Sequence, residues 1–525
     1  MVNIFNKSLS LLATRNYRIL LILLIALLAR FIPGVRTIDD AFITYRYAAN
    51  LLDGFGFLYN PGQQAVLGTT TPLYTILLCI VGTIFGAKNA SFPLIAIVLN
   101  ALADTITCWI LWKLGQHVHR ERVGFAAALA WAIAPFSVTF AIGGLETSIY
   151  VMLLSITILA YCQNKKLLYA LTGSFSLLTR PDALILLFPL MVDRLVRRVR
   201  TNDKIHSPEI IAFLFPIFAW VSFATIYFGT AIPHSIIAKY SAYSLPQTAA
   251  LVRLIQHYAT PFFAHNFLGS TAAILSGLIL FPYLFIIGAR FSMKTDYRLF
   301  AYAVYPCLYF IAFSIANPLI FRWYLTPPLV PYFFFIFLGV DDIINNICIH
   351  FGKYKHLINQ WAGICLLFLL PFASTLSEWT LHPDHGPNRP APEMAWTKLE
   401  LLYTQAANYL SPYFEFDDLT LAAGDVGVLG FITTFEILDT VGLNSPISID
   451  YYPLEEAAYV INYAIPSDLI LDHQPDFLVI LEVYGRETLL KNKIFLDKYS
   501  LINKLPTDIY GSDGMLIFQR SAIEK

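Results

Sequence analysis

Charged residues are scarce in this chain of 525 residues: Asp, Glu, Lys and Arg together make up 13%, and the formal net charge is zero. A neutral chain offers no excess of positive charge to attract nucleic acid, so we expect no nucleic-acid partner. Apolar residues make up 57% and the mean hydropathy is +0.61, whereas apolar residues are roughly half or less of a soluble domain. The composition therefore predicts a polytopic membrane protein that contacts membrane lipids.

Cysteine is also rare. The six cysteines lie in or beside apolar segments, and none follows residue 365. This is typical of small buried hydrophobic residues and predicts neither a disulfide framework nor a zinc site. The first apolar run lacks an evident small-residue cleavage site, so we expect it to remain as an uncleaved span.

Apolar segments of roughly 20 residues can cross a bilayer. Two of the candidates, 167–179 and 182–193, are short and meet at Thr179-Arg180-Pro181-Asp182, so we expect them to form a broken pair. In total we expect about eleven spans: 17–35, 92–112, 123–142, 146–162, 167–179, 182–193, 208–229, 267–289, 299–316, 325–348 and 357–377.

The apolar segment 72–86 decides the orientation. It has only about fifteen residues, which suits a re-entrant or juxtamembrane helix better than a full span. If 72–86 does not cross and the N-terminus is cytoplasmic, the clusters of Lys and Arg between the spans all fall on the cytoplasmic side. We therefore expect a cytoplasmic N-terminus, with the remaining charged motifs and the C-terminus outside.

The composition changes after Trp379, where a polar, proline-rich linker begins. His382 and His385 in this linker are metal-ligand types, but the proline-rich context makes them a weak metal signal. The remainder predicts an α/β domain. Strand-like runs lie at 419–424, 435–438, 477–481 and 515–518, and helical spacing lies at 392–410 and 485–499.

The expected fold class is an all-α membrane bundle with an extracytoplasmic α/β domain at the C-terminus. We expect the transmembrane domain at 1–379 and the extracytoplasmic domain at 380–525. Within the first domain, 37–91 forms an external loop with juxtamembrane helices, and 230–266 forms a further external segment.

Two adjacent carboxylates, Asp39 and Asp40, directly follow the first apolar segment. If a helix begins at Asp39, Arg46 shares a face with Asp39, and Tyr47 shares the next face with Asp40. An ordinary explanation is the start of a helix, where Asp is favoured. A catalytic explanation is that one carboxylate takes the proton of an acceptor hydroxyl.

The same stretch carries a family resemblance. Asp39-Asp40-Ala41-Phe42-Ile43-Thr44-Tyr45-Arg46-Tyr47, followed by Asp53-Gly54-Phe55-Gly56 and Tyr59-Asn60-Pro61-Gly62, resembles the first external loop of bacterial GT-C glycosyltransferases. The likeness is greatest to the mycobacterial terminal arabinofuranosyltransferase group, and more distant to protein mannosyltransferases and aminoarabinose transferases. It implies a GT-C bundle, a polyprenyl-phosphate sugar donor and inverting transfer at the outer face.

The resemblance also implies roles for residues. It implies that Asp39 is the general base, with Asp40 as second choice, and that Arg46 and Tyr47 bind substrate. Gly-Gly-Leu-Glu-Thr around Glu146 resembles the second acidic motif of the family. This glutamate could bind acceptor hydroxyls or, with an aspartate, a divalent metal such as Mg or Mn; alternatively, it lies at a helix start. No other cofactor is expected.

Cations at the outer face are candidates for the donor phosphate, because negative charge grows on that group as the glycosidic bond breaks. Arg180, Lys239 and Arg322 lie in stretches that resemble the family, and we expect His234 and Tyr324 beside them to contact substrate. The alternative for each cation is contact with lipid headgroups.

These observations predict a glycosyltransferase in the bacterial inner membrane, with a glycan, a glycolipid or, alternatively, a protein as acceptor. A lipid-linked saccharide transporter would distribute polar residues through mid-membrane. Only Asp104 lies clearly within a span, where we expect it to have a hydrogen-bonded partner. A non-catalytic scaffold would tolerate the loss of Asp39 and Asp40, and both are present.

Overall fold

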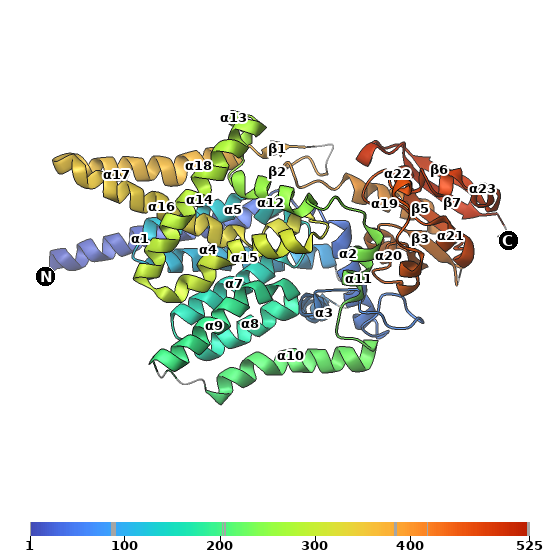
Figure 1. Cartoon of the computed structure of the whole chain (residues 1–525), viewed down its shortest axis with the longest axis horizontal. Coiled ribbons are helices and arrows are strands. Elements are labelled where there is room, and N and C mark those ends of the chain that lie inside the picture. The colour runs from blue at the N-terminus through green and yellow to red at the C-terminus, as the bar shows by residue number, and fades with distance from the viewer. Residues whose placement is uncertain are drawn as a thin grey trace. The chain divides into compact units, whose positions relative to one another are not determined.

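The structure is a computed structural model that describes residues 2–85, 91–201, 203, 206–382, 386–416 and 418–521 (Figure 1). Pro383, Asp384 and His385 of the linker lie outside these residues. The chain divides into two compact units. Unit 1 comprises Met1–Arg36, Ala96–Ile217 and Ala250–Trp396, and unit 2 comprises Thr37–Ile95, Phe218–Ala249 and Thr397–Lys525. The domain division expected between residues 379 and 380 stays a prediction.

Unit 2 contains a five-stranded sheet in the order β4-β3-β5-β7-β6. β3 pairs in parallel with β4 and β5, and β7 pairs antiparallel with β5 and β6. The strands are β3 (Thr420–Ala423), β4 (Glu436–Asp439), β5 (Phe477–Leu481), β6 (Tyr499–Leu505) and β7 (Met515–Arg520). The helices are α2 (Asp39–Leu52), α3 (Pro72–Phe85), α11 (His234–Ala242), α19 (Lys398–Tyr409), α20 (Gly427–Ile432), α21 (Ser467–His473), α22 (Glu482–Gly485) and α23 (Lys493–Lys498).

Four strands of this sheet match the strand-like runs of the sequence, and α19 lies within the predicted helical segment 392–410. The predicted helical segment 485–499 is wrong in part. It is divided into the last residue of α22, a short 3-10 helix at Leu489–Lys491 and the short α23, and it ends at the first residue of β6. The sequence did not predict β6, which lies at the edge of the sheet and carries polar residues such as Ser500 and Lys504. Its pairing with β7 is also irregular, with a register shift between Leu501 and Asn503.

Unit 1 is mainly a bundle of helices, with a small pair of antiparallel strands. The helices that lie wholly or partly in it are α1 (Val2–Phe31), α4 (Phe92–His117), α5 (Glu121–Ile133), α6 (Pro135–Ile142), α7 (Thr147–Cys162), α8 (Lys166–Thr179), α9 (Leu184–Thr201), α10 (Ser207–Phe228), α12 (Ala249–Ala259), α13 (His265–Leu268), α14 (Ser270–Thr295), α15 (Phe300–Ala316), α16 (Leu329–Cys348), α17 (Lys355–Ile364) and α18 (Leu370–Leu376). The strands are β1 (Trp379–Leu381) and β2 (Pro390–Pro392).

Within the described residues, six helices are long and apolar enough to cross a membrane, or seven if a bent pair counts as one span. The chain is therefore a multi-pass membrane protein, whereas the expected total of about eleven spans stays a prediction. α3 has 14 residues, close to the short helix expected at 72–86. The six candidates are Phe92–His117, Ser207–Phe228, Ser270–Thr295, Tyr297–Ala316, Arg322–Gly352 and Lys355–Leu376.

One predicted span and one predicted break can be compared with the helices. The segment 123–142, expected as one span, is divided between α5 and α6, which are bent by 47°. Pro135 explains the break because proline has no N–H to continue the hydrogen bonds of the preceding helix. The break expected at Thr179 is confirmed, since α8 ends there and α9 begins at Leu184.

Glycines allow α14 and α16 of unit 1 to pack closely. A Cβ atom on Gly288 would lie 1.9 Å from the carbonyl oxygen of Phe335, and one on Gly339 would lie 2.0 Å from that of Leu284. Small residues permit close approach of helix backbones, which is the main source of packing between helices in lipid.

A buried ion pair lies in the apolar interior of unit 1. Arg30 on α1 and Asp104 on α4 are both fully buried, and the guanidinium Nε lies 3.1 Å from the carboxylate. The indole N–H of Trp131 and the hydroxyl of Ser148 also donate to Asp104, at 3.0 and 2.9 Å. Asp104 therefore has the partners expected of a mid-span carboxylate, and Arg30 is committed to structure.

Removing one member of this pair should destabilise the fold strongly. We expect Arg30→Met to lower the stability by about 3–5 kcal/mol, because it leaves the Asp104 carboxylate without its counter-ion in an apolar interior. Thermal unfolding in detergent would measure the change. The double variant Arg30→Met/Asp104→Leu should recover much of the loss, and Arg18→Met, at an exposed position, is the control. Equal unfolding temperatures for Arg30→Met and the control would contradict the assignment.

Candidate functional site

Helix α2 begins at Asp39, the helix start that the sequence analysis considered, and places Asp39 and Asp40 in its first turn. Carboxylates at this position interact favourably with the helix dipole. The two side chains have different surroundings. Asp39 is only 7% exposed, whereas 35% of the Asp40 side chain is exposed.

The carboxylate of Asp39 binds the first turn of α20. The backbone N–H of Gly427 donates to Oδ2 and that of Val428 donates to Oδ1, both at 2.8 Å. Burial raises the pKa of Asp39 well above its usual range, and the negative charge of Asp425 raises it further, while the two N–H donors oppose the shift. Both oxygens of Asp39 are therefore committed to the backbone of α20.

Asp40 makes an ion pair with Lys239 on α11. The lysine Nζ lies 3.5 Å from Oδ2, and 25% of the lysine side chain is exposed. This pair combines a solvent-accessible carboxylate with a positive charge that compensates it. Of the two carboxylates that begin α2, Asp40 is therefore the one accessible enough to exchange a proton with a bound hydroxyl group.

Arg46 is buried and its donors bind backbone carbonyl groups. Its Nε donates to the carbonyl of Tyr59 at 2.7 Å, and Nη2 donates to that of Phe435 at 3.2 Å. A further N–H binds the carbonyl of Gly430. The guanidinium also lies over the ring of Tyr59, 4.5 Å from its centroid. These contacts give Arg46 a structural role in unit 2.

Tyr47 is fully buried and His234 is half-buried, and their predicted contacts with substrate stay predictions. The hydroxyl of Tyr47 lies within hydrogen-bond distance of two acceptors, the Val66 carbonyl oxygen at 2.7 Å and the Asn444 Oδ1 at 3.0 Å. The backbone N–H of His234, at the start of α11, donates to Leu67 at 2.8 Å. Its ring Nε2 is buried without a hydrogen-bond partner among the described residues, and burial lowers the pKa of the imidazole.

Two carboxyl groups near Asp39 were not identified from the sequence. Asp425 follows β3, and its Oδ2 accepts hydrogen bonds from the hydroxyls of Tyr403 at 2.7 Å and Tyr484 at 3.2 Å. Burial is the main cause of its raised pKa. Glu400 on α19 accepts the backbone N–H of Asp39 at 3.3 Å, and burial raises its pKa to about 7.

Asp425 lies where α/β sheets commonly bind ligands. It follows the carboxyl end of β3, which has β4 on one side and β5 on the other. The chain passes from β3 to β4 and then to β5 on the other side, so the connections diverge at this edge. The sequence predicted the strand that ends here, but it did not show that Asp39 would bind the backbone that follows, at Gly427 and Val428.

In unit 1, Arg180 is buried between carboxylates and aromatic rings. Its Nε and Nη2 donate to the two oxygens of Asp182 at 2.9 and 3.1 Å, and Nη1 lies 3.5 Å from Glu146. The guanidinium lies 4.7 Å from the ring centroid of Tyr324 and 5.2 Å from that of Tyr150. Its charge is already compensated, which favours a structural role for Arg180, Glu146 and Tyr324.

A divalent metal at Glu146, one of the alternatives that the sequence left open, is not supported by this arrangement. The guanidinium of Arg180 binds both Glu146 and Asp182, the carboxylates that a divalent cation would use. The residues present therefore do not fit a metal ion, and no chemistry is assigned to one at this position.

Arg322 is exposed in unit 1, beside a second arginine that the sequence analysis missed. Burial is the larger cause that lowers the pKa of Arg253 on α12, and the positive charge of Arg322 lowers it further. Arg253 and Arg322 are both exposed. The two positive charges repel each other, and an anion such as a phosphate bound to both would relieve this repulsion.

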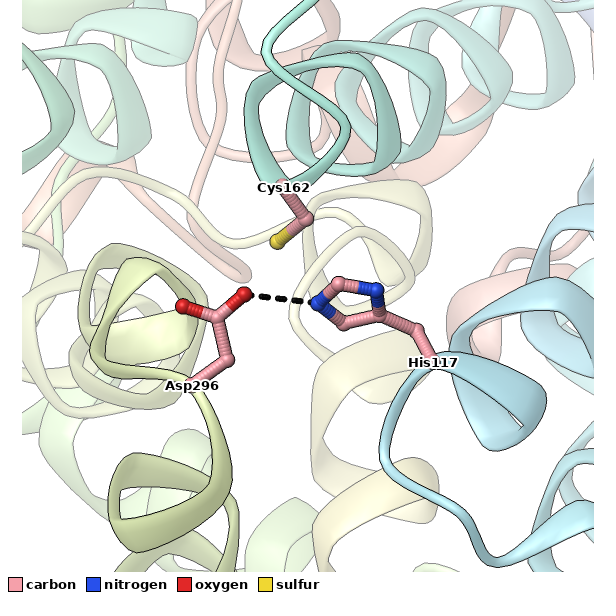
Figure 2. A group of neighbouring side chains, drawn as sticks. All are labelled: His117, Cys162 and Asp296. Carbon is pink, nitrogen blue, oxygen red and sulfur yellow. Dashed lines mark hydrogen bonds and ion pairs between the residues drawn. The ribbon is translucent and has the colours of Figure 1, made fainter.

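A further cluster in unit 1 joins His117 at the end of α4, Cys162 at the end of α7 and Asp296 after α14 (Figure 2). Their ligand atoms all lie within 4.8 Å of one another, and this is the one such group of metal-ligand types among the described residues. The Nε2 of His117 lies 2.6 Å from Asp296.

Asp296 already has a cationic partner. Arg298 donates to it through its backbone N–H at 2.9 Å and through its guanidinium at 2.9 Å. Burial raises the pKa of Asp296, but the hydrogen bonds from His117 and Arg298 outweigh it and hold the pKa well below its usual range. The cluster is therefore best explained as an ion-pair contact between helix ends.

The predicted site residues fall into two groups. Unit 2 holds Asp39, Asp40, Arg46, Tyr47, His234 and Lys239, and unit 1 holds Glu146, Arg180, Arg322 and Tyr324. The carboxylate and the cation that the structure brings together in unit 2 are Asp40 and Lys239.

Comparisons with known proteins agree with this architecture. The structure of ArnT from Cupriavidus metallidurans bound to undecaprenyl phosphate aligns with a TM-score of 0.57 and 10% identity, over 97% of this chain and 98% of that one. The oligosaccharyltransferase of Archaeoglobus fulgidus, in complex with Zn and sulfate, aligns with a TM-score of 0.53 and 12% identity, over 95% and 72%. AglB from the same organism, with an inhibitory peptide and a dolichol-phosphate, gives a TM-score of 0.55 at 10% identity, over 90% and 71%.

This chain has the GT-C fold. The fold expected from the Asp-Asp stretch is thereby confirmed. Residues 393–518 of this GT-C protein match a family described as a domain of unknown function, DUF8728. No curated protein matches the chain.

Glu400 should make the stability of this GT-C protein depend on pH. Its pKa of about 7 in the folded chain exceeds the value of about 4.3 expected in the unfolded chain. The folded chain therefore binds an extra proton between these values, and stability falls as pH rises from about 4.5 to 7. Glu400→Gln keeps an acceptor for Asp39 and removes the titration. We expect a higher unfolding temperature than native at pH 8 and none of this advantage at about pH 4.5.

Thermal unfolding across this pH range would measure the effect. Glu456→Gln is the control because Glu456 is exposed and should leave the native curve unchanged. A constant difference between Glu400→Gln and the native chain at every pH would contradict the raised pKa.

Proposed function

We propose that this protein is a membrane glycosyltransferase that moves a sugar from a polyprenyl-phosphate donor to a hydroxyl group of an extracytoplasmic acceptor. The fold supports this proposal because the similar structures include a protein bound to undecaprenyl phosphate and an oligosaccharyltransferase with a dolichol-phosphate. The proposed acceptor is a glycan or glycolipid of the cell envelope, and a protein acceptor is the second candidate. The proposed location is the bacterial inner membrane, with the N-terminus cytoplasmic.

The ion pair between Asp40 and Lys239 is the observation that carries the proposal. A general base must reach the proton that it removes. The Asp39 carboxylate is buried and accepts two backbone N–H groups, whereas the Asp40 side chain is one-third exposed. We therefore assign the base to Asp40, the second choice of the sequence analysis, and a structural role to Asp39.

The proposed reaction is a single displacement. The acceptor oxygen attacks the anomeric carbon while the bond from that carbon to the phosphate oxygen breaks. Asp40 takes the proton of the acceptor hydroxyl, and the bonding electron pair leaves with the polyprenyl phosphate. Attack from the side opposite the leaving group inverts the configuration at the anomeric carbon. Lys239 compensates the charge of Asp40 before the proton arrives.

Arg253 and Arg322 are the proposed ligands of the donor phosphate. They are exposed, and neither forms an ion pair with a carboxylate among the described residues, in contrast to Arg180. Two guanidinium groups can each donate to phosphate oxygens, and they stabilise the negative charge that grows on the leaving group.

The deciding experiment is sugar transfer by the purified protein in lipid from a panel of polyprenyl-phosphate sugars. We expect one donor to support transfer and Asp40→Asn to reduce the turnover by about 10²–10⁴-fold, because the amide cannot accept the proton. Binding of the donor should be unchanged in this variant. The matched control is Asp53→Asn, which removes an exposed carboxylate at the end of the same helix.

Transfer with no donor, combined with tight binding of lipid-linked saccharide, would instead support a transporter or a scaffold. Full activity of Asp40→Asn would exclude this residue as the base while leaving the enzyme class intact. Parallel assays with glycan and peptide acceptors would separate the two acceptor classes.

The arginine pair makes a separate prediction. We expect Arg253→Ala and Arg322→Ala each to weaken binding of polyprenyl phosphate by about tenfold, because each removes charge-assisted hydrogen bonds. Titration with polyprenyl phosphate in detergent would measure the affinity. Arg290→Ala is the control, since Arg290 is also exposed on a helix of unit 1. Affinities equal to this control would remove the pair from the proposed donor site.

A further inference from the structure

The domain of unknown function at 393–518 makes extensive contacts with the loop that carries the Asp-Asp motif. The contacts begin at Asp39, whose carboxylate binds the backbone N–H groups of Gly427 and Val428. On the other side of the same residue, Glu400 accepts the backbone N–H of Asp39. The first residue of α2 is thus held by two separate segments of the domain.

The contacts continue along the loop. The hydroxyl of Tyr59 donates to the Val426 carbonyl at 2.6 Å. Asn60 and Ile437 of β4 exchange two hydrogen bonds, of 2.9 and 3.2 Å. Arg46 binds the carbonyls of Gly430 and Phe435, so that α2 is also fixed at its middle. Helix and loop are joined to the domain at several points.

Glycines allow this close approach. A Cβ atom on Gly427 would lie 1.8 Å from the carbonyl oxygen of Asp39, and one on Gly430 would lie 2.0 Å from the hydroxyl of Tyr59. Any side chain at Gly427 would therefore push α2 away from the domain. The first turn of α2 and the first turn of α20 meet backbone to backbone.

This arrangement separates the two adjacent carboxylates. Successive residues of a helix point in different directions. When Asp39 points into α20, Asp40 is turned away from it, and its side chain instead meets Lys239 on α11. The direction of Asp40 follows from the position of Asp39.

We propose that the domain of unknown function positions the general base, with Asp39 as the positioning residue and Gly427 as the point of backbone contact. This inference rests on the proposed function, because it assigns to the domain a part in the same reaction. The domain holds the first turn of α2 so that Asp40 faces its substrate hydroxyl. Asp39 itself does not exchange a proton with the acceptor.

The test compares Asp39→Asn, Gly427→Ala and Asp40→Asn in the transfer assay across a range of pH. In Asp39→Asn, the side-chain oxygen can accept one of the two N–H groups of Gly427 and Val428. The side-chain NH₂ group would face the other N–H, and two donors cannot form a hydrogen bond. We expect Asp39→Asn and Gly427→Ala each to lower kcat by about a hundred-fold through misplacement of the base, with the KM for the donor unchanged. Both should keep the fall in rate at acid pH that reports protonation of Asp40, whereas Asp40→Asn should lose it.

One milder variant, with a matched glycine control, keeps the test decisive if Asp39→Asn and Gly427→Ala fold poorly. Tyr59→Phe removes one hydrogen bond of the contact and no charge, and should lower kcat by a few-fold with the same pH profile. Gly485→Ala is the glycine control, because the nearest atom to its Cβ is the end of the Ile480 side chain at 3.0 Å. Hydrogen exchange should be faster in α2 of Asp39→Asn and Gly427→Ala than in the control.

The outcomes separate the inference from the proposed function. One outcome is that the native protein transfers sugar while Asp39→Asn loses the fall in rate at acid pH and Asp40→Asn keeps it. That result would show that the inference is wrong and would leave the proposed sugar transfer intact. Native activity in both Gly427→Ala and Asp39→Asn would also overturn the inference. If the native protein transfers no sugar, the proposed function fails, and the exchange data still decide whether the domain holds α2.

Discussion

The carboxylate of Asp39 is buried against two backbone N–H groups of α20, and the rest of unit 2 depends on this contact. An ionised carboxylate is costly to bury unless donors replace its lost water. The N–H groups at the start of a helix are such donors, because they have no partner within the helix. One buried carboxyl group therefore joins helix α2 to the sheet domain and leaves Asp40 exposed beside Lys239.

The same constraint explains why the charged residues of unit 1 differ in accessibility. Arg30 is fully buried with Asp104, and Arg180 is buried with Asp182. An apolar interior cannot hold a lone charge, so each of these arginines is compensated by an acidic partner. Arg322 is exposed and needs no such partner. Burial thus distinguishes the arginines that stabilise the bundle from one that remains accessible to a phosphate.

Much of the fold could be predicted because local signals and tertiary structure agree. The start of α2 at Asp39 and the break after Thr179 follow from short-range preferences and proline chemistry. The edge strand β6 could not be predicted, because a polar strand exposed at a sheet edge lacks the apolar alternation that identifies strands. Arg253 was missed because a single arginine on an amphipathic helix has an ordinary explanation at the membrane surface.

The sequence by itself determined that this is a membrane protein with the GT-C fold and that an Asp-Asp pair begins a helix after the first apolar segment. Composition and short motifs carry this information because they depend on neighbours along the chain. Only the tertiary structure decided which aspartate is accessible, since Asp39 meets Gly427 across nearly four hundred residues. Hydrogen bonds between distant backbone groups leave no periodic signal in the sequence, and burial depends on those contacts.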